Sequence, residues 1–226
     1  MTEPMDLCSG KTAYVIVDMQ KYYLYDFSPY RLYFNRIQPG CLDYLSERCS
    51  KIVIPNILKI LEYCHEKDIP VLYLRLCGAA QDRSDLHRFF RETYEKGKKS
   101  GFDNVYPLKN DSMADIIDEL APANHDIIID KTTFSAFTSS SIQTVLKERN
   151  IETLIFSGLA TSQCVETTAR DASDHGYTVV HVEDTQADYD AVSHNSSLFS
   201  SQSVCGGMVF STEQILSYNR EGKIFI

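Results

Sequence analysis

The sequence predicts an α/β fold, in which three layers (α/β/α) form around a central, mainly parallel sheet of six strands. Short, nearly continuous apolar runs alternate along the chain with segments in which apolar residues recur at a helical period. The 226 residues are 43% hydrophobic and 23% charged, which is ordinary globular usage and is enough to bury a full core. Because no internal repeat or low-complexity linker divides the chain, we expect one domain over residues 1–226.

Six apolar segments are predicted to form the strands. The first is TAYVIVD, which is β-branched and aromatic, as buried strands are. The segments are Thr12–Asp18, Ile69–Arg75, His125–Lys131, Glu152–Gly158, Tyr177–Asp184 and the weaker Gly206–Ser211. Strands that alternate with helices pair in parallel, so both faces of this sheet should be covered.

Apolar periodicity and capping residues predict the helices between these strands. They cover Cys49–Lys67, Ser84–Lys96, Met113–Leu120, Ser139–Arg149, Gln163–His175, Ala191–Ser201 and a segment from Thr212. The Tyr-rich stretch Met19–Leu45 is interrupted by Pro29, Pro39 and Gly40, which favours a loop with one short helical piece. A pocket lid, an oligomer contact and a surface loop with packed tyrosines are all compatible with this stretch.

Charge and cysteine content exclude several classes of protein. Lys and Arg number 22 against 31 Asp and Glu, a net charge of −9, so binding to nucleic acid is not expected. No apolar run has the roughly 20 residues of a membrane span, and the first eleven residues have no apolar signal-peptide core. The seven cysteines are Cys8, Cys41, Cys49, Cys64, Cys77, Cys164 and Cys205, with no C-x-x-C pair. We therefore expect a reduced, cytoplasmic chain.

Three predicted strands end on, or run into, chemically reactive residues. The first ends at Asp18, the third at Lys131, and the fourth leads through a short turn to Cys164 at a helix start. Ligands bind beyond the carboxyl ends of parallel strands, so these side chains should share one edge. A cation and a helix N-terminus favour a thiolate, and a carboxylate can move the thiol proton. The set predicts acyl transfer at an amide-like C–N bond, with backbone N–H groups stabilising the oxyanion.

Each of these residues also has a simpler interpretation. Asp18 could be a turn residue or a helix cap, and Lys131 could be a solvated surface charge. Cys164 could be a buried residue that only packs in the core. Their joint position at three strand ends is what favours the catalytic interpretation.

Three segments together carry a resemblance to a known family. They are VIVDMQ (Val15–Gln20), ELAPANHDIIIDKTTFSAF (Glu119–Phe137) and SGLATSQCVETTARDASDHGYTVVHVEDTQAD (Ser157–Asp188). The chain resembles the isochorismatase-like cysteine hydrolases, which include nicotinamidases, N-carbamoylsarcosine amidase and ureidoacrylate amidohydrolase. The resemblance spans about Lys11 to Phe210 and is weakest in the Tyr-rich stretch and from Leu76 to Asp111.

The resemblance implies a role for each matching residue. Cys164 corresponds to the family's nucleophile, and Asp18 corresponds to its general acid/base. Lys131 corresponds to the cation that orients this pair and lowers the thiol pKa. It also implies a cis peptide at Leu159–Ala160 and an oxyanion hole made by the N–H groups of Ala160 and Cys164. Four further residues are candidates for the substrate pocket, namely Gln20, Tyr23, Phe137 and Thr161. Tyr23 stands where the family often has Phe, so its hydroxyl would add a polar contact at the pocket wall.

Departures from the family pattern narrow the function. The second strand runs into Arg75 and Cys77, with His87 alone downstream, instead of the Asp-x-His and further His ligands of nicotinamidases. One imidazole does not make a zinc site, so we expect no metal and no cofactor. Arg75, Arg83 and Arg88 are candidates to grip a substrate carboxylate, although an ordinary surface charge is about three times more probable for any one of them.

Together these observations predict a metal-free cysteine hydrolase that cleaves a C–N bond in a small amide, carbamoyl or ureido substrate. One alternative is an isochorismatase-type hydrolase that cleaves a vinyl ether with the aspartate, and another is a non-catalytic binding protein on the same scaffold. Isochorismatases proper replace the cysteine, so the presence of Cys164 favours amide or ureide hydrolysis. The family also implies a homo-oligomer, as dimer or tetramer, with a small molecule as its other partner and no membrane or nucleic acid.

Overall fold

The computed structural model describes Leu7, residues 10–204 and residues 207–221. Its strands form a single sheet of six, in the order β3-β2-β1-β4-β5-β6, and every neighbouring pair is parallel. The strands are β1 (Thr12–Val17), β2 (Val71–Leu76), β3 (Ile127–Lys131), β4 (Thr153–Leu159), β5 (Thr178–Ala187) and β6 (Met208–Phe210). This confirms the predicted α/β class. Cys8, Cys205 and Gly206 lie outside the described residues.

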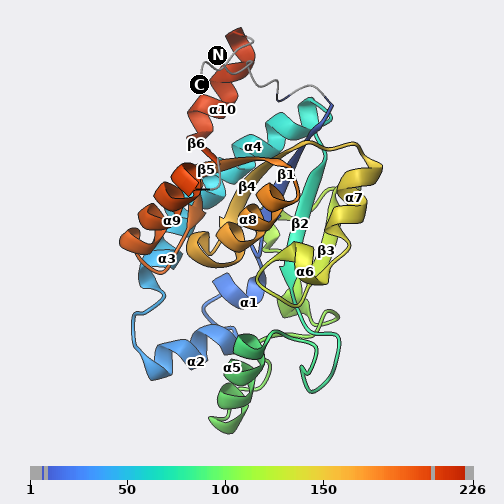
Figure 1. Cartoon of the computed structure of the whole chain (residues 1–226). Helices are drawn as coiled ribbons and strands as arrows, with labels where there is room; N and C mark the ends of the chain where they lie inside the picture. Colours follow the sequence, from blue (N-terminus) through green and yellow to red (C-terminus); the bar gives the residue numbers. More distant parts are fainter. Residues whose placement is uncertain (1–6, 8–9, 205–206, 222–226) are drawn as a thin grey trace.

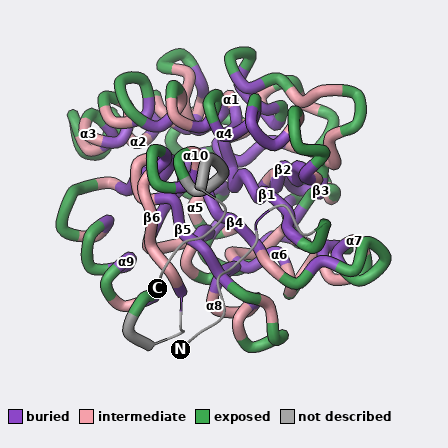
Figure 2. Tube along the Cα trace, turned by 90° about the horizontal axis from the view of Figure 1, so that it is seen from above, coloured by how far each residue is buried: buried purple, intermediate pink, exposed green. Residues whose placement is uncertain are grey.

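The central strands form the core because their side chains are apolar on both faces. Every residue of β1 is buried, and in β4 only the first residue is partly exposed. β3, at the edge of the sheet, alternates between exposed and buried positions. Figure 2 shows the buried strands enclosed between helices whose outer faces are exposed.

Helices cover both faces of the sheet, with α4 on one side and α6, α7, α8 and α9 on the other (Figure 2). The α-helices are α1 (Lys21–Leu24), α2 (Pro29–Ile37), α3 (Asp43–Arg48), α4 (Ile54–Glu66), α5 (Arg88–Lys99), α6 (Ala136–Ser139), α7 (Ile142–Glu148), α8 (Glu166–Asp174), α9 (Ala191–Val204) and α10 (Thr212–Glu221). None of the helices in the described part of the chain is long and apolar enough to cross a membrane.

The Tyr-rich stretch is helical, so the prediction of a mostly loop conformation was wrong. Pro29 occupies the first turn of α2, where its missing N–H has no intrahelical partner to lose. The Ser28 side chain caps this helix by accepting a hydrogen bond from the Arg31 N–H at 3.1 Å. The stretch therefore builds α1, α2 and α3 around its prolines instead of being broken by them.

Two other predicted helices have different bounds. α5 begins at Arg88, because the His87 side chain caps it by accepting from the Phe89 N–H. Ser84 instead lies in a turn, where its N–H is bonded to the Asp82 side chain. The predicted helix Met113–Leu120 is two single 3₁₀ turns, Ser112–Ala114 and Asp118–Leu120, because an isolated antiparallel bridge to Gln20 holds the backbone extended at Ile116 between them.

The carboxyl end of the sheet is covered by its own group of helices. Figure 1 shows α1, α2 and α5 beyond the end toward which the strands point. These helices come from the two least matched parts of the sequence. These three helices, called the roof below, therefore cover the carboxyl ends of the strands.

Candidate active site

The strand order reverses direction between β1 and β4, because the chain moves from β1 toward β3 on one side and from β4 toward β6 on the other. Such a switch point is where doubly wound sheets bind ligands. Asp18 directly follows β1 and has a left-handed backbone, with φ of 51°, which aspartate tolerates better than most residues. The first predicted catalytic residue thus lies at the switch point.

Gly158 allows the ends of β1 and β4 to approach closely. It pairs with Val17 and has φ of 106°. A Cβ on Gly158 would lie 2.1 Å from the Val17 carbonyl oxygen, which no real side chain could occupy. Because Asp18 follows Val17, the absence of a side chain at Gly158 brings the carboxylate close to the turn after β4.

Cys164 lies in the helical turn that follows β4. Residues Thr161–Val165 form a π-helical turn that continues directly into α8. The turn is tied down by the Ser162 N–H, which donates to Asp188 at 2.6 Å, and by Thr168, whose hydroxyl donates to the Cys164 carbonyl at 2.6 Å. The Cys164 residue is buried. The chain therefore holds the thiol at a helix start, as predicted.

Lys131 reaches the same point from two strands away. Its Nζ donates to Asp18 Oδ2 at 2.8 Å and to the Thr133 carbonyl at 3.2 Å, and both charged side chains are at most 2% exposed. β2 lies between β3 and β1, and neighbouring strands are about 4.8 Å apart. Only a long side chain can carry a cation across that distance to Asp18.

The thiol is electrostatically coupled to both members of this ion pair. Burial raises the pKa of Cys164, Lys131 lowers it, and the Asp18 charge raises it again, so the net shift is upward. Burial acts to lower the pKa of Lys131, but the charges of Asp18 and Cys164 outweigh it and the net shift is upward. Lys131 lowers the thiol pKa, as predicted, but the cost of burying a thiolate exceeds the attraction of one paired lysine, so the net shift is upward. The resting group is a neutral thiol beside a carboxylate and an ammonium.

One oxygen of Asp18 is available to the thiol. Oδ2 is bonded to Lys131, while Oδ1 is buried and has no conventional hydrogen-bond partner among the described residues. A buried acceptor left unpaired costs about 1–3 kcal/mol. The Asp18 charge acts on the Cys164 thiol, so this free oxygen can accept the thiol proton during attack.

A small cavity opens onto these groups. Its volume is about 10 Å³, which is close to the space that one water molecule needs. It is lined by Asp18, Tyr22, Tyr23, Tyr30, Leu76, Phe90, Tyr106, Ala160, Gln163, Cys164 and Tyr189. The aromatic rings come mainly from α1, α2 and the segments near α5, so the roof of the sheet closes over the thiol.

Of the four predicted pocket residues, Tyr23 lines this cavity. Its hydroxyl lies 2.6 Å from that of Tyr189. Gln20 instead links β1 to β2 by bonding the Leu76 backbone, and Thr161 bonds His194 Nδ1 at 2.8 Å. Phe137 stacks on His175. None of these last three is among the residues that line the cavity.

The sequence analysis missed four tyrosines of the cavity as individual residues, namely Tyr22, Tyr30, Tyr106 and Tyr189. The density of tyrosines in Met19–Leu45 was the signal for two of them. Tyr106 and Tyr189 carried no such signal, since only the fold brings them to the strand ends. All four have raised pKa values, chiefly because of burial, and stay protonated as hydrogen-bond donors.

One further expectation was wrong. The described residues contain no cis peptide, so Leu159–Ala160 is trans; the trans form is favoured by about 2.5–4 kcal/mol, and an extended Ala160 already makes the turn. The candidate arginines do not reach the cavity. Arg83 is buried and bonds backbone carbonyls such as that of Tyr106, Arg75 pairs with Asp115 and Asp130, and Arg88 lies exposed on α5.

Comparisons with known proteins agree with this architecture. Residues 12–214 match the Isochorismatase domain. The chain is 30% identical over 187 residues to the ureidoacrylate amidohydrolase RutB of Acinetobacter baylyi, covering 75% of this chain and 67% of the relative. It is also 30% identical over 191 residues to RutB of Agrobacterium fabrum, and this match covers 80% of this chain and 78% of the relative.

Solved structures give the same result for the fold. A cysteine hydrolase from Pseudomonas syringae pv. phaseolicola superposes with a TM-score of 0.77 at 25% identity, covering 97% of this chain and 96% of that one. N-carbamoylsarcosine amidase from Thermoplasma acidophilum superposes with a TM-score of 0.66 at 21% identity, covering 90% of this chain and 97% of that one. The matched domain extends from the first strand to the last helix, and the chain belongs to the isochorismatase family of hydrolases.

Proposed function

We propose that this protein is a cysteine hydrolase that cleaves the C–N bond of a small, uncharged amide or ureide, with Cys164 as nucleophile. The observation that carries the proposal is the buried Lys131–Asp18 ion pair, 2.8 Å long, to which the Cys164 thiol is coupled. The RutB relatives are named as ureidoacrylate amidohydrolases, and the Pseudomonas syringae structure as a cysteine hydrolase, which supports C–N cleavage by a thiol.

In the first half-reaction, Asp18 accepts the thiol proton while Cys164 Sγ bonds to the substrate carbonyl carbon. Because the resting thiol is neutral, this transfer has to accompany the attack. The negative charge that develops on the carbonyl oxygen is stabilised by backbone N–H groups of Ala160 and Cys164. In the part of the chain that the structure describes, the Ala160 N–H donates to no other group, so it is free for this role.

The tetrahedral adduct then collapses. The C–N bond breaks, the Asp18 proton passes to the leaving nitrogen, and an amine or ammonia departs from a thioester or thiocarbamate. A water molecule gives one proton to Asp18 and bonds to the carbonyl carbon. The C–S bond then breaks and Asp18 returns the proton to sulfur. Throughout, Lys131 keeps the carboxylate oriented and offsets the negative charge near it.

The cavity lining indicates the substrate class. Among the described residues that line it, Asp18 is the only charged one, and the other polar groups are tyrosine hydroxyls, a glutamine and the thiol. A substrate carboxylate would find no free cation there, because Lys131 is already paired. We therefore expect uncharged amides and ureides to be preferred over carbamoyl amino acids and ureidoacrylate.

The test is an ammonia-release assay over neutral amides, ureides and their carboxylate-bearing analogues, with Cys164→Ala beside the unaltered protein. We expect the variant to lose at least about 10⁴-fold in kcat, as when other covalent nucleophiles are removed. Cys41→Ala, a partly exposed thiol away from the cavity, is the matched control. Turnover that survives Cys164→Ala would favour the vinyl-ether mechanism, and absence of turnover on every substrate would favour a binding protein.

We also propose that the chain associates as a dimer or tetramer. α9 exposes Val192 and Phe199, which are 75% and 73% exposed and lie two turns apart on one side of the helix. Two apolar side chains on the same side of one helix offer a strip for a partner surface, and phenylalanine is among the residues enriched at interfaces. Sedimentation analysis of the protein and of Phe199→Glu checks this, and a monomeric unaltered protein would contradict it.

A further inference from the structure

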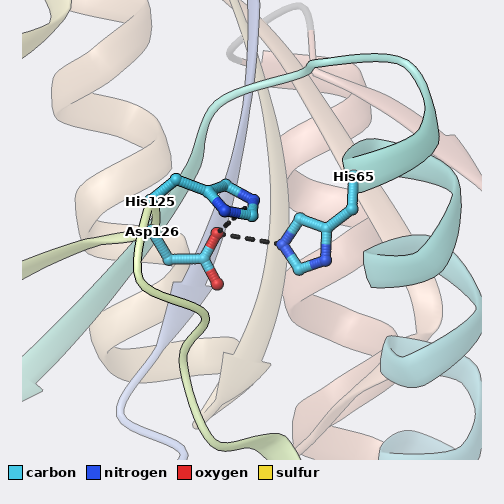
Figure 3. A group of neighbouring side chains, drawn as sticks. All are labelled: His65, His125 and Asp126. Atoms are coloured by element: carbon cyan, nitrogen blue, oxygen red, sulfur yellow. Dashed lines mark hydrogen bonds and ion pairs between the residues drawn. The ribbon is translucent and has the colours of Figure 1, made fainter.

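The amino end of the sheet carries a second group of nitrogen and oxygen donors, far from the thiol. His65 lies near the end of α4, and His125 with Asp126 lies directly before β3 (Figure 3). Among the described residues, these three form a group whose ligand atoms all lie within 4.8 Å of one another. The proposed hydrolase mechanism uses none of them.

The two imidazoles converge on one oxygen of the Asp126 carboxylate. His65 Nε2 is 2.9 Å from Asp126 Oδ1, and His125 Nε2 is 3.7 Å from the same atom. Tetrahedral zinc with ligand bonds of about 2.0–2.1 Å separates its ligand atoms by about 3.3 Å. The two measured separations lie on either side of this value, so small rotations of the imidazoles bring all three atoms to ligand distance.

The carboxylate is held in place before any ligand binds. The Asp126 side chain is 0% exposed, and its Oδ2 accepts the Ala123 N–H at 2.8 Å. Its Oδ1 is thereby directed at the two imidazoles. Outer hydrogen bonds that orient a ligating carboxylate in this way are a regular feature of metal sites.

A simple ion pair explains only part of this arrangement. His65 and Asp126 alone would satisfy each other. His125 is 69% exposed and could point into solvent, yet its Nε2 is turned toward the same oxygen, and its ring packs edge-on to that of His65. A cation between the three groups gives both imidazoles a common partner.

The site is open to solvent. It borders a cavity of about 320 Å³ that is lined by Cys64, His65, Asp68, Ile69, Pro70, His125, Ile127 and Arg149. This leaves room for a water molecule or an outside ligand at a fourth coordination position. Two imidazoles, one carboxylate and an open position make a ligand set that suits zinc and its neighbours better than calcium or magnesium, which prefer all-oxygen sites.

We propose that His65, His125 and Asp126 form a binding site for a divalent transition-metal ion of the zinc type, at the opposite end of the sheet from the catalytic thiol. The metal links the end of α4 to the edge strand β3. Its binding therefore raises the thermal stability of the protein. Since the carboxylate and both imidazoles come from rigid elements or their immediate ends, the site is largely preformed.

The test is a calorimetric titration with Zn²⁺ on the Cys164→Ala background, so that the catalytic thiol cannot act as a ligand. We expect one ion per chain, an increase in Tm, and at least tenfold weaker binding in His125→Ala and in Asp126→Asn. His175→Ala, an exposed histidine at the end of α8, is the control and should bind as the background does.

A Co²⁺ titration of the same proteins identifies the ligands. The d–d bands should be those of a tetrahedral site, without the charge-transfer band of a thiolate. Equal Zn²⁺ affinity in His125→Ala and its background would overturn the proposal, as would a thiolate band that persists in that variant. His125 is exposed, so its replacement leaves the fold intact even if Asp126→Asn does not.

Discussion

The two ends of the sheet each hold a buried carboxylate beside nitrogen donors, but in opposite surroundings. At the carboxyl end, Asp18 and Lys131 are sealed beneath aromatic rings, with a cavity of about 10 Å³. At the amino end, Asp126 faces two partly or largely exposed imidazoles beside an open cavity of about 320 Å³. Similar residue types can therefore serve different chemistry: exclusion of water suits proton transfer, whereas open access suits an ion that must enter.

Among the changes that test this contrast, the largest effect is expected from removing the carboxylate at the closed end. Asp18→Asn should lower amide hydrolysis by about 10²–10⁴-fold, as the loss of a general acid/base does. Yet it should increase the rate at which iodoacetamide alkylates Cys164 at neutral pH, because the Asp18 charge raises the pKa of this thiol and Lys131 lowers it. The measurement is peptide mass mapping of Cys164 over time.

Cys49 provides the internal control for that experiment. Burial raises its pKa to about 12, and Asp18 has no part in this shift. Its alkylation rate should therefore be unchanged in Asp18→Asn. Slower alkylation of Cys164 in the variant would show that the aspartate activates the resting thiol instead of accepting its proton during attack.

Removing one ionic partner at each end tests the contrast directly. Lys131→Met leaves Asp18 as an unpaired buried charge, which should cost about 3–5 kcal/mol of unfolding free energy. His125→Ala at the open end should cost at most about 1 kcal/mol in the absence of metal, since water solvates the group. Urea unfolding measures both, and equal losses would contradict the distinction between the closed and the open end.

Acid should destabilise the protein through two buried histidines, one beside β4 and one beside the turn that follows it. Burial lowers the pKa of His181 and of His194 to about 4, from an ordinary value of 6.5. The unfolded chain therefore binds more protons between these values, and stability present above pH 6.5 falls as the pH approaches 4. A difference of this size corresponds to roughly 3 kcal/mol for each fully buried group.

Unfolding free energies measured from pH 7 to pH 4 would reveal this loss. His194→Gln removes one of the two groups and should roughly halve the slope, while keeping a hydrogen-bonding side chain next to Thr161. The same slope in the variant and the unaltered protein would mean that other groups dominate acid unfolding.

The smallest effect is expected from the roof of the cavity. Tyr23→Phe removes the hydroxyl that lies 2.6 Å from Tyr189, a hydrogen bond worth about 0.5–1.5 kcal/mol. We expect kcat/KM to fall by about two- to tenfold. The alkylation rate of Cys164 is measured as well, and a faster rate would show that the helices covering the cavity open more often. Tyr33→Phe, on the same segment but outside the cavity lining, should change neither.

The amino-acid sequence was enough to predict the six strands, their mainly parallel pairing and the position of Asp18, Lys131 and Cys164 at or just after strand ends. It could do so because burial on both faces of a sheet requires continuous apolar runs, and because the residues that follow such runs must share an edge. The family resemblance rests on the same residues, which explains why the fold and the family could be predicted together.

The environment of those residues depends on how the chain packs in three dimensions. Whether Pro29 breaks a helix or begins one depends on the chain it packs against, and whether Arg83 binds substrate or backbone depends on its burial. The sign of the pKa shift of Cys164 depends on the balance between desolvation and one lysine, which no motif encodes. His65 and Asp126 are distant in sequence and carry no shared motif, so only the packing of α4 against the start of β3 brings them together.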